Sequence, residues 1–468
     1  MSLHQYRHIY FLGIGGIGMS ALARWFLAKG FAVAGYDKTP TPLTQKMEEE
    51  GATIHFEDDV SLIPASFREN KAETLVILTP AVPVTHAERQ YLEREDFTIM
   101  KRAQVLGLLT KDQYLVAVAG THGKTTTSSM VAHLLHHAGV SISAFLGGIS
   151  TDLGSNLLLP HREEARALAV VEADEYDRSF LTLHPDIAVV TSTDPDHLDI
   201  YGEKEALVES FRQFVRQIKP NGYLLLNHTA DQSLAEAVNS SVTVIGYGLE
   251  KEELAAEGVQ IAGGAMKFSA KGRNFLLPQT ALQVPGFHNV ENVLAAAQAV
   301  SLLGVPAEKI SLGISAYTGV KRRFEKVYAS EKRVYLDDYA HHPREIEAFL
   351  QSVRALYPGQ RLRVIFQPHL FTRTRDFLEG FARSLSLADE VWLLDIYPAR
   401  EHPIPGITSV LLYEQLETKK LLLTKKEVLG LLAKDLDYKV LATIGAGDVD
   451  TLVPEIKILL EEMEHVLE

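Results

Sequence analysis

The sequence of 468 residues contains no cysteine. Disulfide bonds, cysteine-ligated zinc and thiol catalysis are therefore excluded, and a reducing compartment such as the cytoplasm fits the composition. Long apolar runs are also missing, because none approaches the ~20 residues that a membrane-spanning helix needs. The first residues, MSLHQYRH, lack the charged-then-apolar pattern of a signal peptide. We therefore expect a cytoplasmic protein without a membrane partner.

Positive charge is scarce. The chain has 46 Lys and Arg residues against 60 Asp and Glu residues, which gives a formal net charge of −14. General affinity for nucleic acid or for an anionic membrane is therefore not expected, although a local basic pocket can still hold a small anionic ligand. The length exceeds that of one ordinary domain, and we expect three domains in a soluble globular chain.

The segment from Tyr114 to His137 has the architecture of a phosphate-binding loop. A continuous apolar run, Leu115–Ala119, predicts a buried parallel strand. It is followed by a glycine turn, Gly120–Gly123, and by a helix that begins near Lys124. The backbone N–H groups of such a turn and the positive end of the helix attract an anion. The segment therefore predicts a nucleotide site.

Two side chains give this loop its chemistry. Lys124 supplies a positive charge for the β- and γ-phosphates, and the Thr125 hydroxyl is placed to bind the accompanying magnesium. The match to G-x-x-x-x-G-K-[ST] is incomplete, because Val118 stands where the first glycine is expected. An ordinary turn followed by an exposed lysine is the alternative, but the strand–loop–helix context favours nucleotide binding.

Residues 8–37 carry a second glycine motif. Gly13, Gly15 and Gly18 satisfy G-x-G-x-x-G between a predicted strand and helix, and Asp37 closes the next strand. This is the dinucleotide-binding fingerprint, in which a diphosphate lies at the helix N-terminus. NAD and a UDP-sugar are both candidate ligands, and a turn needed only for tight packing is the alternative.

A rigid loop adds to this first region. The predicted strand Thr74–Leu78 runs into the sequence TPAVP, which begins with Thr79 and Pro80. Prolines fix the backbone of this loop, and it lies at the carboxyl end of a strand, where parallel sheets bind ligands. We place the first domain boundary near residues 105–112.

Carboxylates and a histidine end two strands of the middle region. The run Leu168–Val171 leads directly into Glu172, which predicts a magnesium ligand beside the phosphate loop. Further along the same segment, Glu175 and Asp177 are expected at the surface. The next strand leads into a loop where His197 stands among three aspartates. This loop is compatible with a metal or phosphate site, and a hydrogen-bonded loop histidine is the alternative.

Asparagines and arginines mark the second domain boundary. Asn289 and Asn292 share one face at the start of a predicted helix, where amide groups can cap the helix or read a nucleobase edge. Arg322 and Arg323 follow at the boundary, near residues 318–323. Beyond it, four strands with polar groups at their carboxyl ends predict a second Rossmann-like sheet.

Taken together, these motifs resemble those of the Mur ligases of bacterial cell-wall synthesis, and the resemblance covers nearly the whole chain. It rests on GIGGIGM at 13–19, AGTHGKTTT at 119–127, VEADEYDRSF at 171–180, DHLDIYG at 196–202, PGFHNVENVLAA at 285–296, GVKRRFE at 319–325, DDYAHHPREI at 337–346 and FQPHLFTRTRDF at 366–377. It implies an α/β fold with three domains, each built on a mainly parallel sheet flanked by helices. These are a Rossmann-like domain at 1–108, a P-loop ATPase-like domain at 109–320 and a Rossmann-like domain at 321–468.

The resemblance also implies a reaction. ATP would transfer its γ-phosphoryl group to the lactyl carboxylate of UDP-N-acetylmuramate, and the amine of L-alanine would attack the acyl phosphate. ATP and Mg²⁺ are the implied cofactors. The substrates are small molecules, nucleic acid and membrane play no part, and the implied enzyme is a monomer or a weak homodimer in the bacterial cytoplasm.

The family motifs assign roles to residues of this chain. The implied ATP-binding residues are Gly120, Thr121, His122, Gly123, Lys124, Thr125, Thr126, Asn289, Asn292, Arg323 and Asp338. The implied UDP-sugar-binding residues are Gly13, Gly15, Gly16, Ile17, Gly18, Met19, Asp37, Thr79 and Pro80. The implied catalytic residues are Lys124, Glu172, His197, Arg323 and Asp338, with Thr125, Glu172 and His197 on metal and His341 and Arg373 on the amino acid.

Two departures bear on the branch of the family. Branches that add later amino acids carry a modified lysine after the D-H-x-D motif, whereas this region reads Phe211–Phe214 without a lysine, as in the alanine-adding branch. Leu370 stands where that branch often has arginine, so the contact to the amino-acid carboxylate would rest on Arg373. The runner-up is the recycling branch that joins the tripeptide L-Ala-γ-D-Glu-diaminopimelate to UDP-N-acetylmuramate. A nucleotide-dependent dehydrogenase and a non-catalytic ATP-binding switch each leave some of the motifs unexplained.

Overall fold

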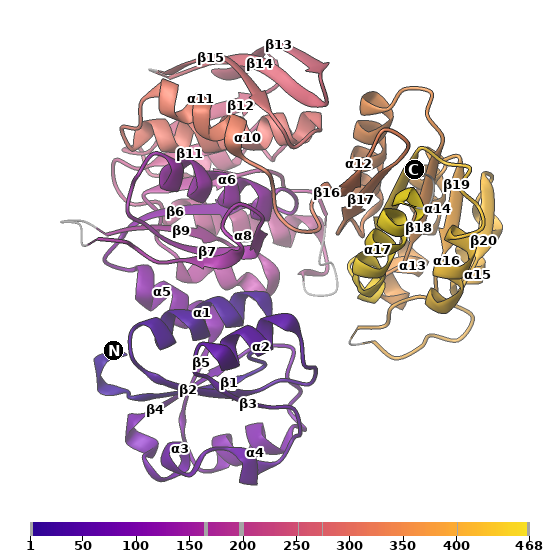
Figure 1. Ribbon diagram of the computed structural model, residues 1–468. Coiled ribbons are helices and arrows are strands. Elements are labelled where there is room, and N and C mark those ends of the chain that lie inside the picture. The colour runs from indigo at the N-terminus through magenta and orange to yellow at the C-terminus, as the bar shows by residue number, and fades with distance from the viewer. Residues whose placement is uncertain are drawn as a thin grey trace. The chain divides into compact units, whose positions relative to one another are not determined.

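The computed structural model describes residues 3–162, 167–195, 201–250, 252–273, 275–399 and 401–465. Three β-sheets flanked by helices make up this part of the chain (Figure 1), which confirms the expected α/β class. The chain forms two compact units. One comprises Met1–Glu257, Ser269–Gln279 and Glu291–Ile314, and the other comprises Gly258–Phe268, Thr280–Val290 and Ser315–Glu468. No helix in the described part has the length and apolar character needed to cross a membrane.

The first sheet consists of five parallel strands in the order β3-β2-β1-β4-β5. The strands are β1 (His8–Leu12), β2 (Ala32–Tyr36), β3 (Thr53–His55), β4 (Thr74–Leu78) and β5 (Thr98–Lys101). The helices are α1 (Ile17–Ala28), α2 (Pro42–Glu49), α3 (Ala65–Glu69), α4 (Ala87–Arg94) and α5 (Arg102–Thr110), with α1 and α2 on one face and α3 and α4 on the other (Figure 1). The strand order changes direction at β1, so the glycine turn after β1 lies where open α/β sheets bind ligands.

The second sheet has the order β15-β14-β13-β12-β11-β10-β6-β9-β7-β8. Its strands are β6 (Tyr114–Ala119), β7 (Ser143–Ser150), β8 (Ser155–Leu158), β9 (Leu168–Glu172), β10 (Ile187–Val190), β11 (Tyr223–Asn227), β12 (Thr243–Gly248), β13 (Leu254–Ala262), β14 (Ala265–Gly272) and β15 (Phe275–Leu282). Its helices are α6 (Lys124–His137), α8 (Lys204–Arg216), α9 (Leu234–Ala237), α10 (Phe287–Leu302) and α11 (Ala307–Ala316).

Strand β6 lies in the middle of this sheet, parallel to β10 on one side and β9 on the other. Val118 is paired with Glu172 of β9, and Ala119 is paired with Val190 of β10. The three strands therefore end side by side. This register gathers the phosphate loop, the carboxylate of Glu172 and the loop after β10 at one edge of the sheet.

The third sheet has the order β16-β17-β21-β18-β19-β20, and only β16 is antiparallel to its neighbour. Its strands are β16 (Glu325–Ala329), β17 (Val334–Asp338), β18 (Leu362–Phe366), β19 (Glu390–Leu393), β20 (Lys419–Leu422) and β21 (Val440–Ile444). Its helices are α12 (Pro343–Leu356), α13 (Phe371–Asp376), α14 (Leu378–Leu385), α15 (Ser409–Gln415), α16 (Lys425–Leu432) and α17 (Leu452–His465). The four predicted strands are present, and β16 and β20 are additional.

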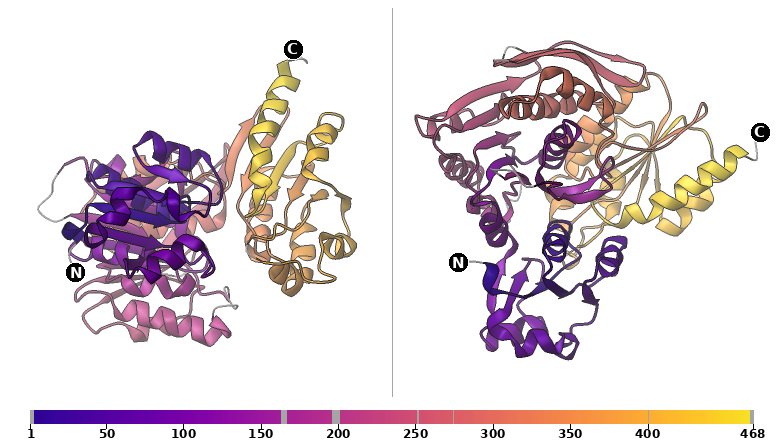
Figure 2. Two further views of the ribbon diagram at one scale, coloured as in Figure 1. Left: turned by 90° about the horizontal axis from the view of Figure 1, so that it is seen from below. Right: turned by 60° about the vertical axis from the view of Figure 1, so that its left-hand side comes forward.

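The C-terminal helix covers one face of the third sheet. Leu452, Ile456 and Leu460 of α17, the yellow helix at the C-terminus in Figure 2, belong to one buried cluster with Tyr335 and Ile365 of the strands. Residues four positions apart lie on the same side of a helix, so these three form a continuous apolar stripe. Burial of this stripe fixes the helix to the sheet.

The first two sheets share one hydrophobic core. A single buried cluster includes Phe11 and Phe26 of the first region and Phe145, Phe180 and Phe211 of the second. Helix α1 also packs on β7 and β8 of the second sheet. The first two regions are therefore joined by apolar contacts of the kind found inside one domain.

Polar contacts reinforce this junction. The fully buried amide of Asn156 in β8 donates to the carbonyl of Ile17 at 2.6 Å and to Ser20 Oγ at 2.9 Å, both in α1. Arg24, further along α1, donates to Ser155 Oγ at 2.7 Å. Buried polar groups stabilise a structure only when they find partners. Here each hydrogen bond joins β8 of the second sheet to helix α1 of the first region.

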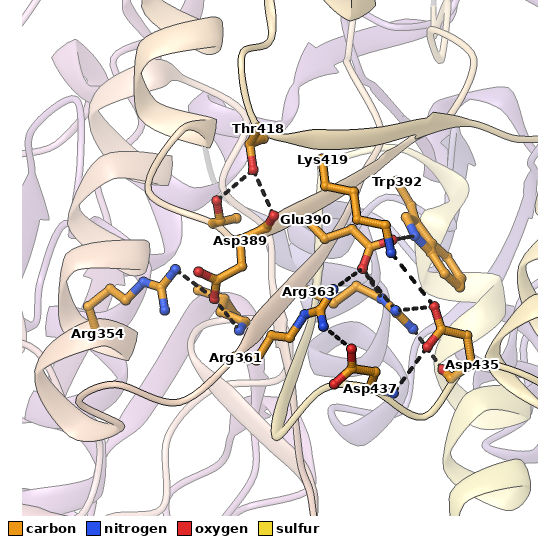
Figure 3. A network of polar contacts seen from close by, with 12 residues as sticks. Arg354, Arg361, Arg363, Asp389, Glu390, Trp392, Thr418, Lys419, Asp435 and Asp437 are labelled. Atoms are coloured by element: carbon orange, nitrogen blue, oxygen red, sulfur yellow. Dashed lines mark hydrogen bonds and ion pairs between the residues drawn. The ribbon is translucent and has the colours of Figure 1, made fainter.

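A buried arginine organises the start of three strands in the third sheet (Figure 3). Arg363 of β18 lies 2.9 Å from Glu390 of β19 and 2.7 Å from Asp435, and its side chain is fully buried. Its guanidinium lies over the rings of Trp392 and Tyr438, at 4.5 Å and 4.7 Å from their centroids. Charge pairing and ring stacking together satisfy the buried guanidinium.

Candidate active site

The turn between β6 and α6 requires glycine at two positions. Gly120 and Gly123 adopt φ angles of 133° and 80°, which side chains disfavour. A Cβ on Gly120 would lie 2.1 Å from Thr191 Oγ1 and 2.8 Å from the backbone nitrogen of Ser192. Both of these residues follow β10, so the neighbouring strand end presses against the loop and holds its shape.

Hydroxyl groups fix the loop from the same side. Ser192 Oγ accepts a hydrogen bond from the backbone N–H of His122 at 2.8 Å and lies 2.9 Å from Thr121 Oγ1. The backbone N–H of Asp194 donates to Thr121 Oγ1 at 3.1 Å. The hydroxyl of Ser192 therefore shapes the loop, although the sequence motif at this strand end suggested a role for its aspartates and histidine.

Lys124 begins α6, and its ammonium group faces carboxylates. Nζ donates to the carbonyl of Gly120 at 2.6 Å and to Oε1 of Glu175 at 2.8 Å. Burial alone would lower the pKa of Lys124, but nearby carboxylates, first among them Glu175, raise it to about 12. Lys124 is therefore charged at neutral pH and suited to bind a phosphate.

Glu175 is fully buried, so the expectation that it lies at the surface is wrong. The hydroxyl of Tyr201 donates to its backbone carbonyl at 2.5 Å. Asp177 is partly exposed and forms an ion pair with Lys101 at 2.6 Å. The expectation was wrong because a run of acidic residues is typical of a solvated turn. The partner of buried Glu175, Lys124, lies far away in the sequence, so the local sequence does not indicate the contact.

The carboxylate of Glu172 lies against β7. A Cβ on Gly147 would lie 2.1 Å from Glu172 Oε2, so this approach requires glycine. Oε2 is buried and accepts no hydrogen bond from any residue that the structure describes. Thr125 is buried in the first turn of α6. A carboxylate oxygen and a hydroxyl beside a phosphate site fit Mg²⁺, which completes its shell with water and phosphate oxygens.

The described residues alone do not form a full metal cage. No group of three or more His, Asp or Glu residues among them is arranged to hold a metal ion. His197, the third expected ligand, lies outside the described residues. Magnesium sites commonly use one or two protein oxygens, so Thr125 and Glu172 remain a suitable pair.

The two asparagines of α10 have different surroundings. A Cβ on Gly123 would lie 2.7 Å from Asn292 Oδ1, which places the Asn292 amide at the phosphate loop. Asn289 donates from Nδ2 to the carbonyl of Pro285 at 2.7 Å, just before the helix. The structure thus brings Asn292 to the loop, and contact of Asn289 with a nucleobase stays a prediction.

The glycine turn after β1 also brings its expected residues together. A Cβ on Gly13 would lie 2.4 Å from Thr79 Cγ2, and the backbone N–H of Gly15 donates to Asp37 Oδ2 at 2.7 Å. Strands β1, β2 and β4 therefore meet at one edge, as the fingerprint requires. The other expected residues of this site are Gly16, Ile17, Gly18 and Met19 at the start of α1, and Pro80 after β4.

Arg102, which lies in none of the sequence motifs, joins this turn to the acidic segment. A Cβ on Gly18 would lie 2.7 Å from Arg102 Nη1, and Nη2 lies 3.4 Å from Asp174. Arg102 begins α5, directly after β5. Its place directly after a strand was the available signal, because the carboxyl ends of strands gather at one edge.

Asp338, at the end of β17 in the third sheet, is nearly buried. Its carboxylate accepts hydrogen bonds from the backbone N–H groups of Phe324 at 2.6 Å and Ala340 at 2.8 Å. Burial raises the pKa of Asp338 to about 6, although the charge of Arg323 opposes this shift. The Arg323 guanidinium lies over the ring of Tyr339, 5.1 Å from its centroid. Arg323 and Asp338 are thus close to each other.

The preceding residue, Asp337, is fully buried. Its carboxylate accepts a hydrogen bond from Thr443 Oγ1 at 2.5 Å and lies 3.4 Å from Arg322 Nε. Burial raises the pKa of Asp337 to about 7, although Arg322 and Thr443 both act to lower it. Asp337 therefore titrates near neutral pH.

Aromatic side chains surround His341. The ring centroids of Tyr339 and His369 lie 5.4 Å and 5.9 Å from that of His341, and Tyr397 stacks on His369 at 5.9 Å. Burial lowers the pKa of His341, and the positive charge of Arg373 lowers it further. His341 and Arg373 are therefore close enough to interact, whereas His369 and Tyr397 were not among the expected site residues.

Comparison with known proteins identifies the family. The Mur ligase family catalytic domain matches residues 8–114, the Mur ligase middle domain matches residues 118–300, and the Mur ligase glutamate ligase domain matches residues 322–449. A UDP-N-acetylmuramate–L-alanine ligase from Phocaeicola vulgatus is 49% identical over 464 residues, which cover 99% of this chain and 100% of the relative. The chain belongs to the Mur ligase family.

Other Mur ligases agree with this assignment. A UDP-N-acetylmuramate–L-alanine ligase from Cytophaga hutchinsonii is 44% identical over 99% of this chain and 98% of its own length. The crystal structure of the UDP-N-acetylmuramate–alanine ligase from Thermotoga maritima has a TM-score of 0.81 and 27% identity, covering 98% and 99% of the two chains. A murein peptide ligase from Psychrobacter arcticus shares the fold, with a TM-score of 0.71, 22% identity and coverage of 97% and 98%.

The carboxyl edge of the second sheet gives this Mur ligase the parts that phosphoryl transfer needs. It combines the glycine loop, the ammonium group of Lys124, the Thr125 hydroxyl and the Glu172 carboxylate. Such reactions depend chiefly on positioning and on neutralising phosphate charge. This edge is also shaped by contacts between distant parts of the sequence, which involve Glu175, Gly147 and Ser192. Local motifs therefore did not reveal the roles of these three residues.

Proposed function

We propose that this Mur ligase joins L-alanine to the lactyl carboxylate of UDP-N-acetylmuramate with hydrolysis of ATP to ADP and phosphate, in peptidoglycan precursor synthesis. The observation that carries the proposal is the likeness, at 49% identity over 99% of the chain, to a curated ligase of that name. The phosphate loop supports it, because Lys124 is held, charged, at the carboxyl edge of the sheet. ATP is the nucleotide, and the bacterial cytoplasm is the proposed location.

The proposed reaction has two steps. A carboxylate is a poor electrophile until a leaving group is attached, so an oxygen of the lactyl carboxylate first attacks the γ-phosphorus of ATP and ADP leaves. The amine of L-alanine then attacks the carbonyl carbon of the acyl phosphate, phosphate leaves, and the nitrogen loses a proton to form the amide. Lys124 and the backbone N–H groups of the glycine loop bind the phosphates and neutralise their charge.

The metal ligands belong to the same proposal. Thr125 and Glu172 are the described residues that would hold Mg²⁺, and His197 is the third proposed ligand. When it is bound, the ion neutralises charge on the phosphate oxygens. The buried Oε2 atom of Glu172, which accepts no hydrogen bond from the described residues, supports this role. His122 and Thr126 complete the proposed ATP-binding loop, with Thr121 and the two glycines.

The first region is the proposed UDP-sugar site. The glycine turn from Gly13 to Gly18 would hold the diphosphate, because its N–H groups and the start of α1 attract anions. Thr79 and Asp37 line the same turn. We assign residues 1–108 to this domain, 109–320 to the ATP-binding domain and 321–468 to the amino-acid-binding domain.

The third region supplies the remaining proposed roles. Arg323 and Asp338 are assigned to the ATP site with Asn289 and Asn292, and His341 and Arg373 to the amino acid. The guanidinium of Arg373 suits a free α-carboxylate, since its planar fork can donate two parallel hydrogen bonds. A single amino acid presents that carboxylate next to the reacting amine.

Release of phosphate tests the proposed function. The enzyme is mixed with ATP, Mg²⁺ and UDP-N-acetylmuramate, and then with either L-alanine or the tripeptide L-Ala-γ-D-Glu-diaminopimelate. We expect kcat/KM for L-alanine to exceed that for the tripeptide by at least ~100-fold, about 2.7 kcal/mol of transition-state binding. A higher kcat/KM for the tripeptide would establish the recycling ligase instead, and no release with either amine would overturn both.

A further inference from the structure

The ammonium group of Lys124 has three N–H donors, and three acceptors surround it. Two are backbone carbonyls of its own loop, Gly120 at 2.6 Å and Thr121 at 3.5 Å. The third is Glu175 Oε1 at 2.8 Å, which comes from a different strand end. Among the described residues, Glu175 is the only side chain that Lys124 Nζ contacts. The two carbonyls belong to the loop, so a phosphate has to compete for the donor that Glu175 holds.

The backbone around Glu175 is held in a strained shape. Asp177 and Arg178 adopt φ angles of 52° and 54°, two consecutive left-handed residues that are not glycine. Such conformations persist only when surrounding contacts enforce them, and they cluster at functional sites. The Arg178 guanidinium lies over the ring of Tyr201, 5.1 Å from its centroid, and Tyr201 donates to the Glu175 carbonyl at 2.5 Å.

Ion pairs hold the same segment from the first region. Asp177 lies 2.6 Å from Lys101 Nζ, and Asp174 lies 3.4 Å from Arg102 Nη2. Glu175 stands between these two aspartates in the sequence and is fully buried. The segment is therefore anchored on both sides of the residue that faces Lys124, which keeps the Glu175 carboxylate aimed at the ammonium group.

We propose that Glu175 is a positioning residue that occupies the place of a nucleotide phosphate oxygen on Lys124, and that the β- or γ-phosphate displaces it when ATP binds. Glu175 Oε1 holds the Lys124 ammonium group by a hydrogen bond of 2.8 Å, in the place where a phosphate oxygen would bind it. Because a carboxylate and a phosphate repel each other and share one donor, nucleotide binding has to work against the Lys124–Glu175 contact. This inference rests on the proposed contact between Lys124 and ATP.

Binding measurements with Glu175→Gln test the inference. Calorimetric titration with Mg²⁺ and a non-hydrolysable ATP analogue should show affinity about tenfold tighter than in the wild type, equivalent to about 1.4 kcal/mol. AMP lacks the β- and γ-phosphates and should bind both proteins within about twofold. A structural role alone would change both affinities together, so the ratio between the two ligands is the decisive readout.

The control is an ion pair at the opposite edge of the same sheet. Asp186, just before β10, lies 2.8 Å from Lys219 and accepts a hydrogen bond from the backbone N–H of Leu115. Asp186→Asn removes a buried carboxylate charge away from the loop and should leave both nucleotide affinities unchanged. In a Lys124→Met background, Glu175→Gln should no longer improve binding of the analogue, because the shared donor is gone.

The outcomes separate this inference from the proposed function. If Lys124→Met weakens binding of the analogue but Glu175→Gln brings no gain, or an equal gain for AMP, the positioning role is refuted and the proposed ATP site stands. If Lys124→Met leaves the analogue's affinity unchanged, the proposed role of Lys124 fails. Should Glu175→Gln not fold, Glu175→Asp, which withdraws the carboxylate by one methylene, takes its place with the same expectation.

Discussion

Two ion pairs with buried carboxylates in this Mur ligase have nearly the same length and different surroundings. Lys124 lies 2.8 Å from Glu175, and Arg363 lies 2.9 Å from Glu390. The guanidinium of Arg363 is covered by Trp392 and held by further carboxylate and carbonyl oxygens, and Glu390 accepts additional hydrogen bonds. Among the described residues, the other acceptors around the Lys124 ammonium group are two carbonyls of its own loop. We call the first pair exchangeable, because Lys124 can bind another anion in place of Glu175. We call the second pair saturated, because both of its members have further hydrogen-bond partners.

Position along the strands explains the difference. Lys124 follows the carboxyl end of β6, whereas Arg363, Glu390 and Lys419 are cross-strand neighbours near the starts of β18, β19 and β20. In parallel sheets, ligands bind at the carboxyl edge. A buried pair at the opposite edge can therefore serve stability alone. Although burial would raise it, hydrogen bonds from Trp392, Arg363 and Lys419 hold the pKa of Glu390 below its ordinary value.

Breaking the saturated pair should have the largest effect on the molecule. Arg363→Ala leaves Glu390 buried without its main partner, and such losses cost about 3–5 kcal/mol in the free energy of unfolding. Denaturant unfolding of the variant should show this loss. Arg354→Ala is the control, because Arg354 pairs with Asp389 at 3.0 Å nearer the surface and such pairs contribute at most about 1 kcal/mol. Equal effects of the two substitutions would contradict the comparison.

Breaking the exchangeable pair should instead slow turnover strongly. Lys124→Ala removes the charge that binds the transferring phosphoryl group, which should raise the barrier by roughly 3 kcal/mol, about 100-fold in kcat. Binding of UDP-N-acetylmuramate, measured by calorimetry, should stay within about twofold, because its proposed site is on the first sheet. Near-normal turnover at saturating ATP would remove Lys124 from the active site.

Substitution of Arg373 should change substrate binding without changing stability. Arg373→Lys keeps the charge but loses the fork geometry, so KM for L-alanine should rise with a cost of about 1–3 kcal/mol. Arg375→Lys is the matched control, since Arg375 belongs to the same helix α13 and pairs with Asp376 at the surface. Thermal unfolding of both variants should match that of the wild type. An unchanged KM in Arg373→Lys would place the carboxylate elsewhere.

The smallest expected effect concerns Asp337, a buried carboxylate whose pKa burial raises from 3.8 to about 7. Between these values the folded state keeps a proton that the unfolded state has lost, so stability falls as the pH rises from about 4 to 7. Asp337→Asn cannot ionise. Its Tm relative to the wild type should therefore increase between pH 5 and pH 8, on the order of 2–4 °C. A difference independent of pH would mean that Asp337 keeps an ordinary pKa.

The fold was predictable wherever a strand is a short apolar run. Strands β4, β6 and β9 were found within a residue, because parallel strands buried on both faces are continuously apolar. Strands β13 to β15 were not found. In β15 the burial alternates along Phe275–Leu282, and such half-exposed strands show weaker signals in a single sequence.

The site residues were predictable where they belong to one local sequence motif. Lys124, Thr125 and Glu172 stand next to turns or strand ends, so their positions follow from local sequence. Glu175 and Gly147 could not be found in this way. The burial of Glu175 depends on Lys124, 51 positions away, and the need for glycine at position 147 arises from the side chain of a neighbouring strand. Long-range contacts of this kind are set by the assembled sheet.

The core shared by the first and second sheets has a consequence for cooperativity. Three sheets suggest three independent melting steps, but Phe11 and Phe26 are buried in the same cluster as Phe180 and Phe211. A group of residues that loses its packing together unfolds as one unit. We therefore expect scanning calorimetry to resolve two transitions, one for each compact unit, and three would show that the shared core does not couple them. Two transitions would mean that the molecule has fewer cooperative unfolding units than it has sheets.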